Sequence, residues 1–355
     1  MRTHDYDDET QALSDAIERY VRRRIAEPQP LDGPRTLQEL NRRAGATITP
    51  EGLGGSEALR LWTEVLALAT ISTDSPRYMA FVPGAPTKGS VLFDLVISAS
   101  STYGGSWMEG AGAVWAENQV LDWLAGSTGF PSGAGGAFVS GGTAGNLSAL
   151  VAARHAAERH SGRPPRRRIA CADTAHSSVA SAAHVIDADV IAVPHDERGR
   201  LTGASLRAAL ALTDTDGLFA VVASAGSTNA GMIDDLAGVA DVCAERGIWL
   251  HVDGAYGGAA LLAPSLRSAF DGLERADSFI VDPHKWLFAP FDACALLYRD
   301  PAIARGAHRQ RASYLDTLSS SDGWEPERLR APPHTAGTRA SDVVLPRGLR
   351  DGCLP

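Results

Sequence analysis

The segment "SFIVDPHKWLFAPFDACALLY" (278–298) places a lysine, Lys285, between two strongly apolar runs. The first run has the β-branched and aromatic residues typical of a strand, and it ends at Asp282 and Pro283. Burying an ammonium group costs several kcal/mol unless the group is paired or neutralised. A lysine at this point therefore predicts a specific chemical partner.

Similar apolar runs recur upstream from about residue 135, and helical patterns separate them. The runs are "GAFVS" (136–140), "RIACA" (168–172), "DVIAVP" (189–194), "GLFAVVAS" (217–224) and "GIWLHVD" (247–253). Continuous apolar strands that alternate with helices predict a mostly parallel sheet covered on both faces. The sequence therefore predicts an α/β fold.

The composition narrows the class of protein. The 355 residues are 44% hydrophobic and 21% charged, which is ordinary for a globular protein, and the net charge of −9 argues against nucleic acid or an anionic membrane as partner. Cys171, Cys243, Cys294 and Cys353 form no CxxC pair, as expected of reduced cytosolic thiols. With no apolar run of about 18 residues and no signal peptide, we expect a cytoplasmic protein without a membrane partner.

Polar side chains follow the predicted strands. After "GAFVS", Gly141 and Gly142 turn into a helix whose first amides form an anion site suited to a phosphate. His176, Thr228 and Asp253 follow three further strands. Because ligands of open α/β sheets bind at the carboxyl ends of strands, these residues predict one site. Taken singly, each also has a purely structural explanation. The two glycines could form an ordinary turn, His176 could be a structural histidine, Thr228 could belong to a turn, and Asp253 could cap a helix.

Together these residues fit one ligand, pyridoxal 5'-phosphate. Lys285 would be neutralised as a Schiff base with the aldehyde of this cofactor. Asp253, following a very apolar strand, would keep the pyridine nitrogen protonated, so that the ring acts as an electron sink. The flat ring of His176 could stack on the cofactor, and the helix start would hold the phosphate.

The motifs "DTAHSSV" (173–179), "WLHVDGAYGG" (249–258) and "DPHKWL" (282–287), in this order and spacing, resemble those of the group II pyridoxal-phosphate-dependent amino-acid decarboxylases. This family includes aromatic-L-amino-acid, tyrosine, glutamate and diaminobutyrate decarboxylases. The segments 106–124 and 139–154 are similar to its bacterial branch, and the resemblance covers about residues 60–328.

The resemblance implies catalytic roles for three residues. Lys285 would carry the cofactor, Asp253 would contact the ring nitrogen of the cofactor, and His176 would lie on the face of that ring. It implies no metal. The cofactor-binding residues that it implies are Thr143, Ala144, His176, Thr228, Asp253, Ala255, His284 and Lys285.

The resemblance also implies the type I fold of pyridoxal-phosphate enzymes, an α/β architecture with a mostly parallel seven-stranded sheet flanked by helices, and a homodimer. It divides the chain into an N-terminal helical dimerisation segment (1–74), a large cofactor-binding domain (75–300) and the start of a small C-terminal domain (301–328). Residues 329–355 show no clear helical or strand periodicity. When this tail is back-translated into GC-rich codons and read one frame over, one choice of codons gives a sequence similar to the family's continuation. We therefore expect a largely missing small domain and an aberrant or disordered tail.

The implied reaction is decarboxylation of an L-amino acid, the small-molecule partner, to its amine and CO₂. Another type I enzyme, such as an aminotransferase, and an inactive truncated relic are alternatives. A metal site is a further alternative, because His251, Asp253, Asp282 and His284 are suitable ligand types, but it leaves Lys285 unexplained.

Overall fold

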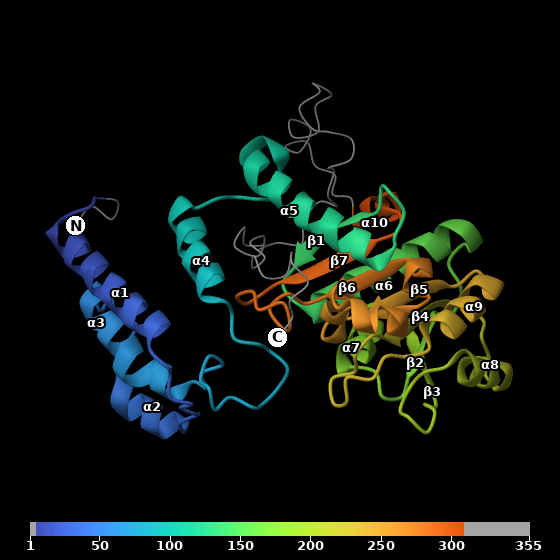
Figure 1. The fold of residues 1–355 in the computed structure, drawn as a ribbon, viewed down its shortest axis with the longest axis horizontal. Helices are drawn as coiled ribbons and strands as arrows, with labels where there is room; N and C mark the ends of the chain where they lie inside the picture. The colour runs from blue at the N-terminus through green and yellow to red at the C-terminus, as the bar shows by residue number, and fades with distance from the viewer. Residues whose placement is uncertain (1–4, 309–355) are drawn as a thin grey trace. The chain divides into compact units, whose positions relative to one another are not determined.

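The computed structural model describes residues 5–308 and is drawn in Figure 1. By its internal contacts the chain forms two compact units, Met1–Lys88 and Gly89–Pro355. The predictions for residues 309–328 and for the tail at 329–355 lie outside the described residues. The expected boundary between the dimerisation segment and the cofactor-binding domain, after residue 74, stays a prediction.

The first unit is helical. Its helices are α1 (Asp8–Ala26), α2 (Leu37–Ala44) and α3 (Gly55–Leu61), and α3 continues through a π-helical turn (Trp62–Leu66) and a 3-10 turn (Ala67–Ala69). The carboxylate of Asp7 caps α1 by accepting a hydrogen bond from the Thr10 N–H at 2.9 Å. Thr36 and Glu39 cap α2 reciprocally. Both caps satisfy N–H groups that have no partner inside their helix.

The second unit contains one seven-stranded sheet. Its strands are β1 (Gly135–Val139), β2 (Arg168–Ala172), β3 (Asp189–Val193), β4 (Leu218–Ser224), β5 (Trp249–Asp253), β6 (Ser278–Val281) and β7 (Cys294–Tyr298). Its helices are α4 (Lys88–Ser100), α5 (Trp107–Thr128), α6 (Gly142–Ser161), α7 (Ser177–Val185), α8 (Gly203–Leu212), α9 (Leu236–Arg246) and α10 (Pro301–His308). No helix of the described part is both long and apolar enough to cross a lipid bilayer. The predicted α/β architecture with a seven-stranded sheet is confirmed.

The strand order decides where the carboxyl ends of the strands lie. The order is β1-β7-β6-β5-β4-β2-β3. Neighbours from β6 to β3 pair in parallel, whereas β7 is antiparallel to both β1 and β6. All strands except β7 therefore point the same way, and their carboxyl ends share one edge of the sheet. The residues predicted for the site follow these strands, so the sheet gathers them at that edge.

Helices cover both faces of the sheet (Figure 1). Leu121 of α5, Leu206 of α8 and Val239 of α9 belong to the buried cluster on one face. Leu150 of α6 and Val179 of α7 belong to the cluster on the other face, together with a residue of α10. Because the central strands are covered on both sides, they consist of continuous apolar runs and do not alternate with polar residues.

A glycine lets α6 approach the sheet closely. A Cβ atom on Gly145 would lie 2.9 Å from both the Cys294 Sγ and the Ile280 Cγ2 atoms, closer than real Cβ atoms come to such neighbours. The absence of a side chain thus allows the first turn of α6 to pack directly on β6 and β7. This contact fixes the N-terminus of α6 at the carboxyl edge of the sheet.

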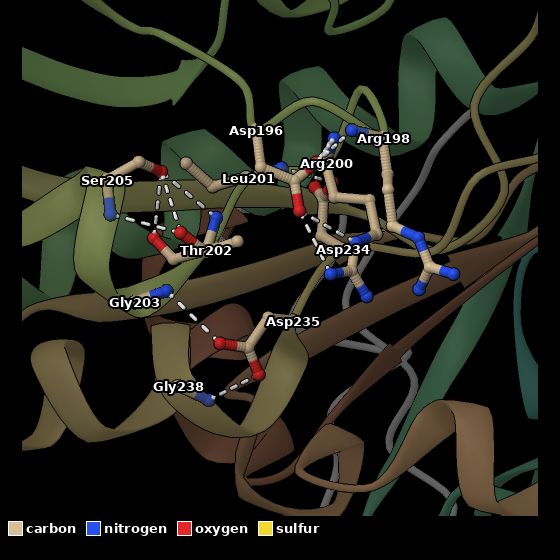
Figure 2. A network of polar contacts seen from close by, with 10 residues as sticks. All are labelled: Asp196, Arg198, Arg200, Leu201, Thr202, Gly203, Ser205, Asp234, Asp235 and Gly238. Carbon is tan, nitrogen blue, oxygen red and sulfur yellow. Dashed lines mark hydrogen bonds and ion pairs between the residues drawn. The ribbon is translucent and has the colours of Figure 1, made fainter.

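Two aspartates before α9 anchor the neighbouring loops (Figure 2). The Asp234 carboxylate accepts hydrogen bonds from the Leu201 N–H at 2.8 Å and from the Ser224 N–H at 2.6 Å. Burial raises the pKa of Asp234 to about 6, although these two hydrogen bonds lower it. Asp235 caps α9 by accepting from the Gly238 N–H at 3.0 Å. The network holds the end of β4 in place beside the edge where the predicted residues meet.

Candidate active site

A cavity of about 280 Å³ opens at the carboxyl edge of the sheet. Its volume is close to the lower end of the roughly 300–1,000 Å³ range that is typical of small-molecule sites. The walls come from the segments that follow β1, β2, β4, β5 and β6. The lining includes Gly142, Thr143, Asn146, His176, Ser178, Ser227, Thr228, Asp253, Ala255, Tyr256, Asp282, His284 and Lys285.

The glycine turn after β1 forms one wall. Gly141 has a φ of +121°, a conformation that favours glycine, and it is the N-cap of the 20-residue helix α6. The first amides of a helix have no partner within the helix, and they carry the positive end of its dipole. Those of Gly142 and Thr143 therefore offer hydrogen bonds and positive potential to an anion in the cavity.

Asp253 ends β5 and is 8% exposed. Its Oδ1 accepts a hydrogen bond from the Ala255 N–H at 3.0 Å, and its Oδ2 accepts one from the Asn146 Nδ2 at 2.9 Å. Both oxygens are thus held by donors, which stabilise the charged carboxylate in a buried place. An anion fixed in this way can bind a cationic or N–H group of a ligand.

Lys285 follows β6 and has a charged partner within one turn. The Lys285 Nζ lies 2.9 Å from the Asp282 Oδ2, and the Asp282 side chain is 2% exposed. The other oxygen, Oδ1, is buried and has no hydrogen-bond partner among the described residues. The question raised by a lysine between apolar strands thus has a structural answer, because its ammonium is paired.

His176 and His284 are held by different contacts. His176 is the N-cap of α7, and its Nδ1 lies 3.2 Å from the Ser178 N–H and 2.8 Å from the Ser178 Oγ. The His284 Nδ1 lies 2.7 Å from the Ala293 carbonyl oxygen, and its ring packs on Phe291 with centroids 5.0 Å apart. Both imidazoles line the cavity in fixed orientations.

The structure brings together seven of the eight predicted cofactor-binding residues around this cavity. The eighth, Ala144, is adjacent to Thr143 on α6 but packs against the apolar cluster under the helix. Among the lining residues that were not predicted as site residues, Asn146, Ser178 and Asp282 contact predicted ones. Asn146 lies four residues after Gly142, one helical turn further along α6. That spacing is the signal that could have identified it.

The metal alternative is not supported by the geometry. His251 is fully buried, and both of its ring nitrogens already have hydrogen-bond partners, at Ser278 and Asn146. In residues 5–308 no group of three or more His, Cys, Asp and Glu side chains is placed to hold a metal ion. The His251 ring thus belongs to a hydrogen-bond network under the cavity.

A larger depression of about 1,000 Å³ lies at the opposite edge of the sheet. Its lining includes Gly217 and Ile248, which precede β4 and β5, and Asp277, which precedes β6. It contains none of the residues that carry the predicted chemistry. The smaller cavity is therefore the candidate active site.

Comparison with known proteins identifies the family of the chain. The model of the family described as "Pyridoxal-dependent decarboxylase conserved domain" matches residues 62–323. The chain is 33% identical over 290 residues to an aromatic-L-amino-acid decarboxylase of Bacillus atrophaeus, in an alignment that covers 80% of this chain and 60% of that protein. It is 28% identical over 332 residues to an L-2,4-diaminobutyrate decarboxylase of Acinetobacter baumannii, covering 87% of this chain and 64% of that protein.

Solved structures show a similar fold. A crystal structure of Oryza sativa TDC with PLP and tryptamine matches with a TM-score of 0.81 and 26% identity, covering 97% of this chain and 74% of that one. The chain spans about 60% of the length of the Bacillus relative. Because the family model matches well over half of its residues, this chain belongs to the pyridoxal-dependent decarboxylase family.

Proposed function

We propose that this chain binds pyridoxal 5'-phosphate and acts as a carboxy-lyase that converts an L-amino acid to its amine and CO₂. The observation that carries the proposal is the convergence of Lys285, Asp253 and the N-terminus of α6 on one cavity. The proposal is also supported by relatives named as amino-acid decarboxylases and by the similar Oryza sativa structure with PLP.

The chemistry of the cavity fits this cofactor. The amides at the start of α6, next to Thr143 and Ala144, suit a phosphate, and the buried Asp253 carboxylate suits a protonated ring nitrogen. A Cβ atom on Gly142 would lie 3.1 Å from the Ala255 Cβ atom, so the glycine keeps this wall open. Thr228 and His284 line the same cavity and would supply further contacts to the cofactor.

When bound, pyridoxal phosphate supplies an electron sink for the electron pair of the bond broken at the substrate's Cα atom. The residues of the chain provide the rest. Asp253 would hold a proton at the ring nitrogen of the cofactor, and Lys285 would anchor the cofactor through Nζ. Asp282 orients that amine through its contact at 2.9 Å. His176 would contact the cofactor ring, as the family resemblance implies.

The proposed substrate class is the L-amino acids. The named relatives act on aromatic amino acids, on tryptophan and on L-2,4-diaminobutyrate, which sets a panel for assay. Tyr256 lines the cavity and stacks on Trp286 with ring centroids 5.6 Å apart. This aromatic wall would favour a substrate with a flat side chain, so L-tryptophan and L-tyrosine are the first compounds to test.

We also propose a homodimer in the cytoplasm. Exposed apolar side chains on α4 support the dimer, since a surface of this kind is normally covered by a partner. The three cysteines in the described part, Cys171, Cys243 and Cys294, are free and buried, as is usual for a reducing compartment.

The chain has two lysines, Lys88 and Lys285, and this allows a sharp test. Borohydride reduction of the protein with pyridoxal phosphate should add a phosphopyridoxyl mass to the peptide that contains Lys285. The Lys285→Ala variant should lose the visible absorption of the bound cofactor and all turnover. Lys88→Ala is the matched control, because Lys88 is half-exposed and lies 3.8 Å from Asp74, and it should keep both signals.

An unchanged absorption spectrum in Lys285→Ala would contradict the assignment of the lysine. Release of CO₂ with formation of the amine supports decarboxylation. Formation of an oxo acid without CO₂ would instead indicate an aminotransferase. Cofactor binding without any product would indicate an inactive relic.

A further inference from the structure

A chain of buried side chains extends beneath the candidate active site. The Trp249 Nε1 lies 2.9 Å from the Ser278 Oγ, and that oxygen lies 2.9 Å from the His251 Nδ1. The His251 Nε2 lies 2.8 Å from the Asn146 Oδ1. His251 and Ser278 are both fully buried, and Asn146 is 1% exposed. This chain links the core of the sheet to Asn146, at the start of the second turn of α6.

At Asn146 the chain divides toward two residues of the cavity. The Asn146 Nδ2 lies 2.9 Å from the Asp253 Oδ2 and 2.8 Å from the Ser178 Oγ. The Ser178 Oγ lies 2.8 Å from the His176 Nδ1. A single amide thus contacts the carboxylate directly and contacts the imidazole through one hydroxyl.

The donor and acceptor at each contact follow from the chemistry of its ends. An indole N–H can only donate, and an ionised carboxylate can only accept. The Asn146 group that faces Asp253 must therefore be the NH₂, and its oxygen must accept from the His251 Nε2–H. In neutral imidazole the other nitrogen is then an acceptor, and it receives the Ser278 hydroxyl proton. At every hydrogen bond from Trp249 to Asp253, the donor is consequently the group on the Trp249 side and the acceptor is the group on the Asp253 side.

The same logic fixes the second branch. The Ser178 hydroxyl accepts one proton of the Asn146 amide, so its own proton is directed to the His176 Nδ1. The Ser178 N–H also points to that nitrogen, at 3.2 Å. With two donors directed at Nδ1, the neutral His176 ring carries its proton on Nε2.

His251 must be neutral for this arrangement. Burial lowers the pKa of the His251 imidazole well below its usual value, and the opposing attraction of Asp253 is smaller. A charged His251 would donate its Nδ1–H to the Ser278 oxygen, which has a second lone pair beside the one that accepts the Trp249 N–H. The buried Ser278 hydroxyl proton would then lose the His251 nitrogen as its acceptor.

We propose that Asn146 is a positioning residue that fixes the Asp253 carboxylate and the Nε2–H form of His176 together, and that neutral His251, held by Ser278 and Trp249, sets the orientation of the Asn146 amide. The effect on the cofactor rests on the proposed function, whereas the hydrogen-bond directions do not.

The directions are tested on the protein without added cofactor. Long-range ¹H–¹⁵N NMR of histidine-labelled protein at about pH 8, where an ordinary histidine is neutral, distinguishes the two ring forms. His251→Gln and His176→Gln variants identify the two signals. We expect both rings to carry the proton on Nε2. A proton on Nδ1 of either ring, or a charged His251, would overturn the proposal.

The effect on the cofactor is tested by pyridoxal phosphate titration of matched variants. Asn146→Leu keeps the branched shape of the side chain without the amide, and His251→Phe removes the donor to Asn146. Each should weaken binding by about tenfold or more, the size of effect that loss of an orienting partner has at metal sites. His251→Gln keeps an N–H donor and should bind within about threefold of the unaltered chain. The control is Asn118→Ser, because Asn118 is also a buried amide, and it donates to the Val114 carbonyl within its own helix α5.

Asn118→Ser should lose stability without a change in cofactor affinity, which separates positioning from packing. Equal cofactor affinity in Asn146→Leu and the unaltered chain would refute the positioning role. If the unaltered chain fails to bind pyridoxal phosphate, the proposed function is wrong. The protonation of the two histidine rings, measured by NMR, then still shows whether the hydrogen bonds run in the proposed directions.

Discussion

At the scale of single residues, Lys285 shows how a charge is tolerated between apolar strands. The sequence predicts that the amine is neutralised by a cofactor. The structure adds a second partner, because Asp282 lies three residues earlier in the same turn, 2.9 Å from Nζ. The ion pair offsets part of the cost of placing an ammonium between apolar strands.

His251 leads to a prediction about pH. Its folded pKa is lowered by burial, so below its ordinary value of 6.5 the unfolded chain binds a proton that the folded chain does not. Stability should therefore fall as pH decreases below about 6.5, by about 1.4 kcal/mol for each pH unit in which only the unfolded chain holds the proton. Urea unfolding of the unaltered chain and of His251→Gln at several pH values measures this difference. Parallel pH profiles for the two proteins would contradict it.

At the scale of elements, α6 connects the fold to the site. Its N-terminal amides face the cavity, and its side chain Asn146 reaches Asp253, which is 107 positions away in sequence. Both features depend on the close contact of the helix with β6 and β7. Gly145 permits this contact because it has no side chain.

A pair of glycine variants tests the contact. In Gly145→Ala the added methyl group would collide with Cys294 and Ile280, so α6 must shift, at a cost of about 1–3 kcal/mol in unfolding free energy. The matched control is Gly126→Ala on α5, where a Cβ atom meets no other atom within 4 Å. That change should stabilise the protein by about 0.5–1 kcal/mol through helix propensity. Destabilisation of the same size in both variants would show that the contact at Gly145 is unimportant.

At the scale of the whole molecule, the second unit contains all the lining residues of the candidate active site. The same unit presents Leu92, Phe93, Leu95 and Val96 on α4, each at least 44% exposed. Such a run of exposed apolar residues is unusual on an isolated protein, which is why we propose that a second copy covers it.

The proposed dimer is tested by Phe93→Glu. A carboxylate at the centre of an apolar interface would be buried without a partner, so the variant should elute as a monomer when the unaltered chain elutes as a dimer. Light scattering coupled to size-exclusion chromatography measures both masses. Leu212→Glu is the control, because Leu212 at the end of α8 is also exposed but is not part of α4. A monomeric unaltered chain, or a dimeric Phe93→Glu, would count against the interface.

Much of the architecture could be predicted from the sequence, because it depends on local patterns. The run "RIACA" coincides with β2, and "SFIVD" covers β6 and the aspartate that follows it. Glycines before a helix indicate the turn at Gly141. The residue types of the candidate site are likewise visible, since a buried Lys285 and a buried Asp253 require partners whatever the fold.

The partners themselves depend on the tertiary structure. The antiparallel β7 lies between β1 and β6, which brings α6 over strands that are remote in sequence. Only this arrangement places Asn146 against Asp253, His251 and Ser178, which are 107, 105 and 32 positions away. Hydrogen bonds need atoms within about 3 Å of each other, and no local pattern encodes such proximity between separate elements. The sequence by itself thus determined which groups the site contains, and the packing of α6 on the sheet decided which of them hold one another in place.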